Sequence, residues 1–100
     1  MKTDEKTYTT YILRCSDGTY YTGYARSLKD RLRKHQLGLG AKYTRTRRPV
    51  ELVASWTFPS RSQAMKLEAA IKRQNRRKKE SFIKGKPSPE EMEEDLLKGN

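Results

Sequence analysis

One carboxylate interrupts an otherwise apolar stripe in the second half of the chain. The stripe has the i, i+3, i+4, i+7 spacing of one helix face and consists of Ala64, Leu67, Glu68 and Ile71. An unpaired charge on a buried face is costly, so Glu68 needs a partner. The stripe alone favours a salt bridge with one of the 23 Lys and Arg residues over a metal at the edge of the core. A metal site stays open as the second explanation, because Mg²⁺ needs only one or two protein carboxylates and takes its other ligands from water and phosphate.

An arginine and a histidine form a second pair that could do chemistry. Arg31 and His35 are spaced i, i+4, which puts them on one face of a helix, one turn apart. A guanidinium suits a phosphate oxygen, and an imidazole transfers protons near neutral pH. The alternative is a surface Arg beside a His that interacts favourably with the C-terminus of its helix.

Tyrosine is concentrated near the start of the chain. Five of the six tyrosines lie in its first quarter: Tyr8, Tyr11, Tyr20, Tyr21 and Tyr24. Neighbouring residues of a strand point to opposite faces, so Tyr20 and Tyr21 must diverge. Some of these rings pack across strands, and the others are free to stack on bases or to supply phenol hydroxyls.

Two dense clusters of Lys and Arg predict contacts with phosphates rather than a merely solvated surface. The expected nucleic-acid-binding residues are Lys42, Arg45, Arg47 and Arg48 in the first cluster and Lys72, Arg73, Arg76 and Arg77 in the second.

The overall composition also indicates a polyanionic partner. The 100 residues include 23 Lys and Arg against 12 Asp and Glu, a net charge of +11, which favours nucleic acid. The single cysteine, Cys15, excludes an internal disulfide and a cysteine cluster for zinc, and favours the cytoplasm over secretion. Apolar runs are too short for a membrane segment or a signal peptide. We therefore expect a cytoplasmic monomer with no membrane partner.

Strand and helix patterns alternate along residues 8–83. Residues 8–14 and 19–24 are rich in β-branched and aromatic side chains, and the Asp17-Gly18 turn between them predicts an antiparallel hairpin. Ser27 is placed to cap a helix that ends at Gly38 or Gly40. A flexible basic loop over 38–49, a third strand over 50–58, a helix after Ser60 and a short helix over 76–83 complete the pattern.

These elements predict an α+β fold in the order β-β-α-β-α-α, with a three-stranded antiparallel sheet flanked by helices. Residues 1–84 form this domain. Residues 85–100 carry a net charge of −3 and begin with two prolines, which predicts a flexible acidic tail with at most a frayed helix. The alternative is that the tail competes with nucleic acid for the basic surface.

Taken in order, these residues resemble the GIY-YIG nuclease family, and especially its small stand-alone bacterial members. The family has two tripeptides on adjacent strands, to which Thr9-Thr10-Tyr11 and Tyr21-Thr22-Gly23 are similar. Further similar segments stand at 11–15, 40–44 and 69–73. The first tripeptide lacks the family's Gly and Ile, the second has Thr for Ile, and Tyr24 stands where some repair relatives have Lys.

The resemblance implies metal-assisted hydrolysis of a phosphodiester bond. Its catalytic set falls here on Tyr11, Tyr21, Arg31, His35 and Glu68. Glu68 would hold one Mg²⁺ or Mn²⁺ ion. Tyr11 would activate the attacking water, with His35 to relay its proton or orient the phenol. Arg31 would neutralise charge on the phosphoryl oxygens.

The remaining site residues have supporting roles by the same resemblance. Tyr21 would orient the water or the phosphate, and Gly23 would let the backbone pass close to the site. Asn75 is a candidate for a late Asn of the family, on the face of Glu68 if one helix continues through both.

The expected function is that of a divalent-metal-dependent endonuclease acting on DNA rather than RNA, on branched or single-stranded substrates, in repair or recombination. The alternative is a basic nucleic-acid-binding module with little or no catalysis. A ribosome- or RNA-associated protein is a third hypothesis, supported by size and charge only. Glu68 separates the first two, because a carboxylate that faces a polyanion weakens plain binding.

Overall fold

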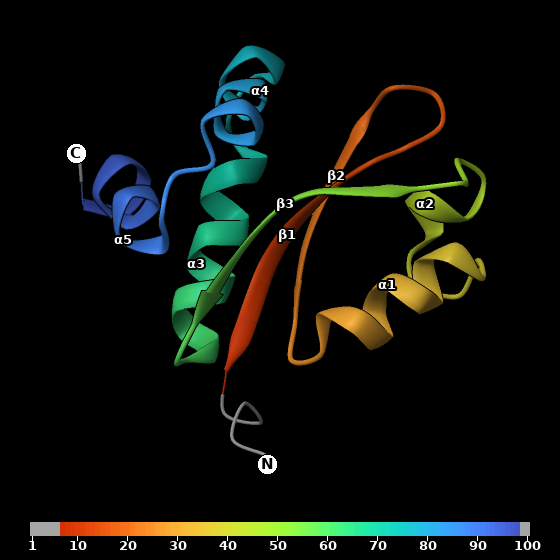
Figure 1. The fold of residues 1–100 in the computed structure, drawn as a ribbon, viewed down its shortest axis with the longest axis horizontal. Helices are drawn as coiled ribbons and strands as arrows, with labels where there is room; N and C mark the ends of the chain where they lie inside the picture. The colour runs from red at the N-terminus through yellow and green to blue at the C-terminus, as the bar shows by residue number, and fades with distance from the viewer. Residues whose placement is uncertain (1–6, 99–100) are drawn as a thin grey trace.

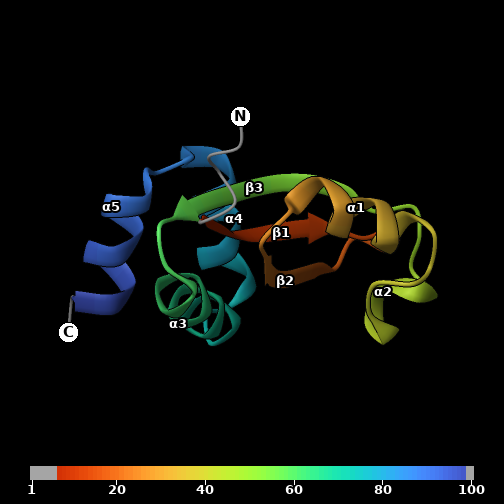
Figure 2. The same cartoon turned by 90° about the horizontal axis from the view of Figure 1, so that it is seen from below.

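The computed structural model describes residues 7–98 and has a three-stranded antiparallel sheet between two groups of helices (Figures 1 and 2). Its strands are β1 (Tyr8–Arg14), β2 (Tyr20–Ala25) and β3 (Glu51–Phe58), in the spatial order β2-β1-β3. The helices are α1 (Leu28–Gln36), α2 (Lys42–Arg45), α3 (Arg61–Lys72), α4 (Arg76–Gly85), α5 (Pro89–Met92) and the π-helix η2 (Glu93–Lys98). The predicted α+β fold and sheet are confirmed, with α2, α5 and η2 in addition.

The predicted hairpin of β1 and β2 sets which side chains meet. Gly18 takes the left-handed φ of 86° that the turn requires, and Asp17 Oδ1 accepts hydrogen bonds from Thr19. The resulting register pairs Tyr11 with Gly23 and Leu13 with Tyr21.

Alternation along β1 divides the core into two layers, one on each face of the sheet. One layer packs the sheet against the C-terminal helices and consists of Ile12, Trp56, Phe58, Ala64, Leu67, Ile71, Phe82 and Met92. The other consists of Tyr11, Leu13, Cys15, Ala25 and Val50, with Tyr21, Leu28 and Leu32 packed against it. Figure 1 shows the corresponding arrangement, with α3 and α4 on one side of the strands and α1 on the other. Tyr11 therefore lies in the layer that faces α1.

Side-chain caps fix where the two principal helices begin. Ser27 accepts a hydrogen bond from the backbone N–H of Asp30, and Ser60 accepts one from that of Gln63. Helix α1 ends before Gly38, whose φ of 82° allows the chain to turn. These caps set the rotation of α1 and α3, and with it the direction of the side chains that they carry.

The segment over 38–49 is more ordered than the predicted flexible loop. It contains α2, and the Thr44 side chain in this helix is fully buried. Arg47 anchors the segment, because its Nε donates to Asp17 Oδ2 at 3.0 Å and its guanidinium lies 3.9 Å from the centre of the Tyr43 ring. Sequence reasoning gave weight to the charge of this segment and overlooked these contacts.

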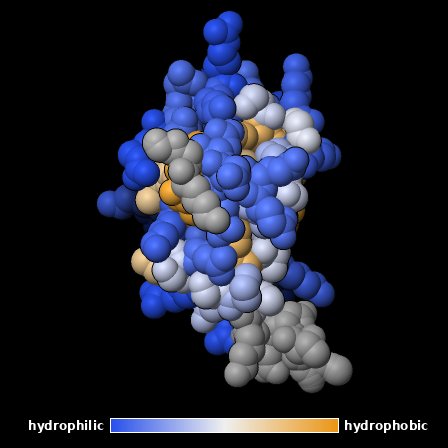
Figure 3. Space-filling model, turned by 90° about the vertical axis from the view of Figure 1, so that its left-hand side faces the viewer, coloured by the Kyte–Doolittle hydropathy of each residue, from blue (hydrophilic) through white to orange (hydrophobic). Residues whose placement is uncertain are grey.

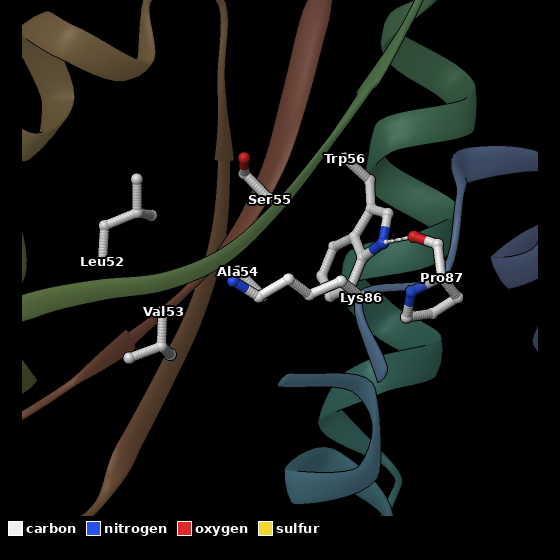
Figure 4. A pocket seen from close by; sticks show the side chains of 7 residues that line it. All are labelled: Leu52, Val53, Ala54, Ser55, Trp56, Lys86 and Pro87. Atoms are coloured by element: carbon white, nitrogen blue, oxygen red, sulfur yellow. Dashed lines mark hydrogen bonds between the residues drawn. The ribbon is translucent and has the colours of Figure 1, made fainter. Parts of the chain in front are cut away.

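In place of the expected flexible tail, the described residues 86–98 pack on the domain. Met92 is completely buried in the core beside α3, and Leu96 packs against the same cluster. The Trp56 indole N–H donates to the Pro87 carbonyl at 2.8 Å, as Figure 4 shows, and Gln63 donates to Glu93 at 2.9 Å. Apolar residues spaced within an acidic segment bring it back to the body of the protein.

Charged and polar side chains dominate the face of the molecule drawn in Figure 3, with small, separated apolar areas between them. Among residues 7–98, no helix has the length and apolar character needed to cross a membrane.

Candidate active site

A buried hydrogen bond joins the first strand to the end of the first helix. The Tyr11 hydroxyl lies 3.0 Å from His35 Nε2, and Tyr11 and His35 are 0% and 1% exposed. Tyr11 comes from the middle of β1, and His35 from the last turn of α1. The strand and the helix are fixed independently by the sheet and by the Ser27 cap, so the pair is held in place before any substrate binds.

A second hydrogen bond determines which nitrogen of His35 carries the proton. His35 Nδ1 lies 2.8 Å from Thr44 Oγ1, and the Thr44 hydroxyl donates its only proton to the Ala41 carbonyl. Thr44 therefore accepts from Nδ1–H, which leaves Nε2 as the acceptor for the Tyr11 hydroxyl. The result is a directed chain from Tyr11 through His35 and Thr44 to the backbone. Sequence reasoning missed Thr44, although it falls in the 40–44 segment that is similar to the family.

Tyr21 completes an aromatic wall around the imidazole. Its ring centre lies 5.2 Å from that of His35 in an edge-on arrangement, and Tyr43 stacks on Tyr21 at 6.1 Å. The structure thus brings Tyr21 to the Tyr11–His35 pair, as the alternation along β2 predicts, while Tyr20 hydrogen bonds to Glu80 instead.

Arg31 is the charged neighbour of the pair. Burial, with a smaller contribution from Tyr21, raises the pKa of the Tyr11 phenol from 10.0 to about 12, although the positive charge of the nearby Arg31 guanidinium acts in the opposite direction. Burial and, second, the charge of Arg31 lower the pKa of His35 below 6.5. At neutral pH the free protein therefore holds a neutral phenol beside a neutral imidazole.

Glu68 lies at the border of this cluster, on the buried stripe of α3. Its side chain is 21% exposed, and Oε2 is 3.2 Å from Lys72 Nζ, so the salt bridge expected from the stripe is present. Its charge is also close enough to Tyr11 to be the smallest of the influences that raise the pKa of the phenol. Glu68 thus has both an ion pair with Lys72 and an electrostatic link to Tyr11.

The donor set fits a cation that is held mainly by its substrate. Within the described residues, no three His, Cys, Asp or Glu side chains come together as a metal cluster. Glu68 is partly exposed and supplies one carboxylate, which is enough for Mg²⁺ or Mn²⁺ when water and phosphate oxygens complete the shell. A resident structural metal of the zinc type would need more protein ligands.

Two glycines give the site the space that it needs. A Cβ at Gly23 would lie 2.7 Å from the Tyr11 hydroxyl oxygen, and a Cβ at Gly40 would overlap the His35 ring, 2.7 Å from Cγ. Contacts this short force a neighbour to move, so both positions need a residue without a Cβ. Sequence reasoning identified Gly23 as a site residue, and it noted Gly40 as a possible helix end and in the family-like segment 40–44 but not as a site residue.

The expected shared face of Asn75 and Glu68 does not form. Helix α3 ends at Lys72, and Asn75 instead caps α4 by accepting a hydrogen bond from the Lys78 N–H at 2.8 Å. The amide oxygen of Asn75 is used in this cap.

Seven of the eight basic residues expected to bind nucleic acid are exposed. Arg76 is bound to Glu80 and lies over the Tyr20 ring, and Arg48 donates to backbone carbonyls. The positions classed as exposed are Lys42, Arg45, Arg48, Lys72, Arg73, Arg76 and Arg77, and Arg47 is half-buried.

A family model described as the GIY-YIG catalytic domain matches residues 7–81. The chain belongs to the GIY-YIG family. GIY-YIG domains define a nuclease superfamily that acts on nucleic acids, and its members generally depend on a divalent metal. The matched residues include the whole cluster around Tyr11.

Small bacterial proteins are similar to this GIY-YIG chain over most of its length. The UPF0213 protein BH0048 of Halalkalibacterium halodurans is 51% identical over 81 residues, which cover 81% of this chain and 86% of the relative. The UPF0213 protein SAG0778 of Streptococcus agalactiae is 51% identical over 74 residues, covering 74% and 84%. These relatives confirm a stand-alone bacterial type of GIY-YIG protein.

Solved structures agree with the fold. The solution NMR structure of the UPF0213 protein BH0048 from Bacillus halodurans has a TM-score of 0.55 and 46% identity, and the alignment covers 91% of this chain and 97% of the other. The solution NMR structure of the protein EF2693 from E. faecalis has a TM-score of 0.56 and 41% identity, with 80% and 85% covered.

Proposed function

We propose that this GIY-YIG protein is a divalent-metal-dependent endonuclease that hydrolyses phosphodiester bonds in DNA, with branched and single-stranded DNA as its substrates in repair or recombination in the cytoplasm. The observation that carries the proposal is the hydrogen bond between Tyr11 and His35 beside Arg31. This bond gives the phenol a proton acceptor beside a guanidinium, which is the combination that activation of a water at a phosphate requires.

The first step is activation of water by Tyr11. Its pKa of about 12 means that a free phenolate is scarce at neutral pH. The phenol can instead pass its own proton to His35 Nε2 while it takes a proton from the water. The water oxygen then forms its bond to phosphorus, and His35 becomes an imidazolium. The bond from phosphorus to the leaving oxygen breaks with its electron pair on that oxygen, which takes up a proton from solvent.

The neighbouring residues support this relay. Thr44 accepts from His35 Nδ1–H before and after the transfer, so the ring does not need to turn. Arg31 offers a guanidinium for the oxygens on which negative charge develops. Tyr21 limits the position of the water or the phosphate through its contact with the His35 ring. Tyr11, Tyr21 and Arg31 are therefore the residues proposed to contact the reacting groups, and His35 acts through Tyr11.

Glu68 is the residue that would hold the metal. The ion, when bound, supplies charge stabilisation at the scissile phosphate and at the leaving oxygen. In the free protein the Glu68 carboxylate forms an ion pair with Lys72. Because this pair is half-exposed, it contributes little and is easily exchanged for a cation.

The decisive experiment compares cleavage with binding. The protein is incubated with branched, single-stranded and duplex DNA and with RNA, with and without Mg²⁺ or Mn²⁺. Alongside it are Glu68→Gln and Glu94→Gln, the latter a matched change at an exposed carboxylate in η2. Metal-dependent cleavage that Glu68→Gln abolishes and Glu94→Gln retains supports the proposal. Tight binding by all three proteins without cleavage supports the binding-module alternative, and cleavage of RNA in preference to DNA overturns the assigned substrate.

A further inference from the structure

A cleft rich in arginine adjoins the candidate active site, and of the residues that line it only Arg31 takes part in the chemistry proposed above. It measures about 530 Å³ and is lined by Tyr8, Tyr24, Ala25, Arg26, Arg31 and Arg61. None of the described residues that line it is an Asp or a Glu. Three guanidiniums and two phenols make a surface that favours an anion over a cation or an apolar ligand.

Arg31 connects this cleft to the reacting groups. Its guanidinium lines the cleft, and its charge also acts on the Tyr11 phenol. A nucleic-acid strand whose phosphate is bound by Arg31 therefore lies next to the cleft.

Helix α3 gives a second link between the cleft and the site. Arg61 is the first residue of α3, and Glu68 follows seven residues later. Seven residues are close to two turns, so the two side chains share one helix face about 10 Å apart along the axis. The carboxylate and the cleft arginine therefore border one continuous surface.

Hydrogen bonding already orients Arg61 toward an anion. Its Nε donates to the Tyr24 hydroxyl at 3.2 Å, which leaves the terminal nitrogens of the guanidinium and the phenolic proton of Tyr24 as donors. Arg61 and Arg31 have no carboxylate oxygen within 4.0 Å in the described part of the chain. A nearby phosphate would therefore not have to displace an acidic partner from either residue.

We propose that the cleft bordered by Arg26, Arg61, Tyr8 and Tyr24 binds the phosphodiester backbone of the substrate strand beside the scissile phosphate. The proposal rests on the nucleic-acid substrate of the proposed function and adds the path that this substrate takes. These four residues lie outside both basic clusters singled out in the sequence. The cleft positions the strand and does no chemistry.

The test is a salt titration of binding, made without divalent metal so that no cleavage occurs. Fluorescence anisotropy of a labelled single-stranded DNA gives Kd over a series of KCl concentrations. The variants are Arg61→Gln, the charge-conserving Arg61→Lys, and Arg14→Gln. Arg14 is an exposed arginine at the opposite end of β1, about 20 Å from Tyr8. Circular dichroism confirms that each variant is folded, which the exposed position of Arg61 favours.

If the cleft binds the substrate strand, the three variants should differ in affinity and in salt dependence as follows. Arg61→Gln lowers the slope of log Kd against log salt by about 0.7 and weakens binding about fivefold at 0.1 M salt, as one lost phosphate contact requires. Arg61→Lys retains the slope, and Arg14→Gln retains both the slope and the affinity.

Other patterns overturn the cleft or the nuclease separately. If Arg61→Gln binds like Arg14→Gln while the parent protein cleaves DNA with metal, the cleft proposal is wrong and the proposed function stands. If Arg61→Gln shows the expected loss but no protein cleaves any nucleic acid, the cleft is supported and the proposed function fails. A parent protein that does not bind DNA at all overturns both.

Discussion

The Tyr11 hydroxyl and His35 Nε2 lie 3.0 Å apart with almost no exposure to solvent. A buried phenol needs a hydrogen-bond partner, and a histidine with only one free acceptor nitrogen is a selective one. The sheet fixes the phenol and α1 fixes the imidazole. Substitutions at this pair therefore test whether the reaction depends on proton transfer between the two side chains.

Removing the hydroxyl of Tyr11 should stop the reaction while the fold persists. Tyr11→Phe retains the ring in the core and removes the group that meets His35, so we expect cleavage to fall by about 10²- to 10⁴-fold. Steady-state cleavage of the best DNA substrate measures the effect. Tyr20→Phe, which removes the hydroxyl that meets Glu80, is the control and should cleave normally. Equal activity of the two variants would remove Tyr11 from the mechanism.

Titration of His35 should give a pKa below 6.5, and NMR can assign it without ambiguity because the chain has one histidine. The native state disfavours the charged ring, so the unfolded chain binds the proton first as the pH falls. The free energy of unfolding should therefore decrease on acidification below about 6.5. Long-range ¹H–¹⁵N spectra at pH 7 should show Nδ1 protonated. A pKa above 6.5 would contradict the assignment.

The same logic at high pH applies to Tyr11, with the opposite sign. Its pKa of about 12 keeps the phenol protonated in the native state after an unfolded chain has begun to ionise near 10.0. Stability should therefore fall as the pH rises between about 10 and 12. In Tyr11→Phe this part of the pH dependence should be absent, and chemical denaturation at a series of pH values measures it.

The Thr44 hydroxyl should fix the tautomer of His35. Thr44→Val has a similar shape but removes the acceptor of Nδ1–H, so we expect an unpaired buried donor and a loss of about 1 to 3 kcal/mol in stability. A positioning role also predicts that part of the Nδ1-protonated form is replaced by the Nε2-protonated form, which cannot accept from Tyr11. The ¹⁵N spectrum of His35 distinguishes this result from simple destabilisation. Thr44→Ser, which retains a hydroxyl, should retain the original tautomer.

Gly40 should tolerate no side chain. Gly40→Ala places a Cβ against the His35 ring and must move it or the backbone. A displacement of about 1 Å at a proton-transfer group costs about 100-fold in rate. Gly85→Ala is the matched control, because a Cβ at Gly85 has nothing within 4 Å. Normal cleavage by Gly40→Ala would show that the ring position is not critical.

The C-terminal segment should contribute to the stability of the whole domain. Met92→Ala removes a completely buried side chain, so we expect the free energy of unfolding to fall by about 2 to 4 kcal/mol. Met65→Ala, at a methionine that is 42% exposed on α3, should change it little. Urea denaturation of both variants provides the comparison. Equal midpoints would mean that the segment does not pack as described.

The sequence predicts the sheet, the principal helices and the position of Tyr11 because these depend on short-range patterns. Alternation places Tyr11 and Tyr21, the Asp17-Gly18 turn sets their register, and the i, i+4 spacing joins Arg31 to His35. Such rules operate within one element or one hairpin, so a single sequence is enough to apply them.

What the sequence does not reveal depends on contacts between distant segments. In the sequence Thr44 is one polar residue in a basic segment, and only the fold shows that α2 places its hydroxyl against His35. In the sequence Met92 is one apolar residue among acidic ones, and only the fold shows that it packs against Trp56 and α3. The sequence places Asn75 on the helix of Glu68 because no glycine or proline marks the end of α3 at Lys72. In each case tertiary contacts decide the role of the residue.

Helix α3 combines two tasks that a protein engineer would prefer to keep apart. Ala64, Leu67 and Ile71 anchor it in the core, and Glu68 projects from between them. A substitution chosen to raise heat resistance on this helix would also shift the carboxylate, so gains in thermal tolerance there should come at the expense of turnover. Helix α4 and the residues after it offer safer ground for directed evolution, because none of the residues proposed to contact the reacting groups lies there.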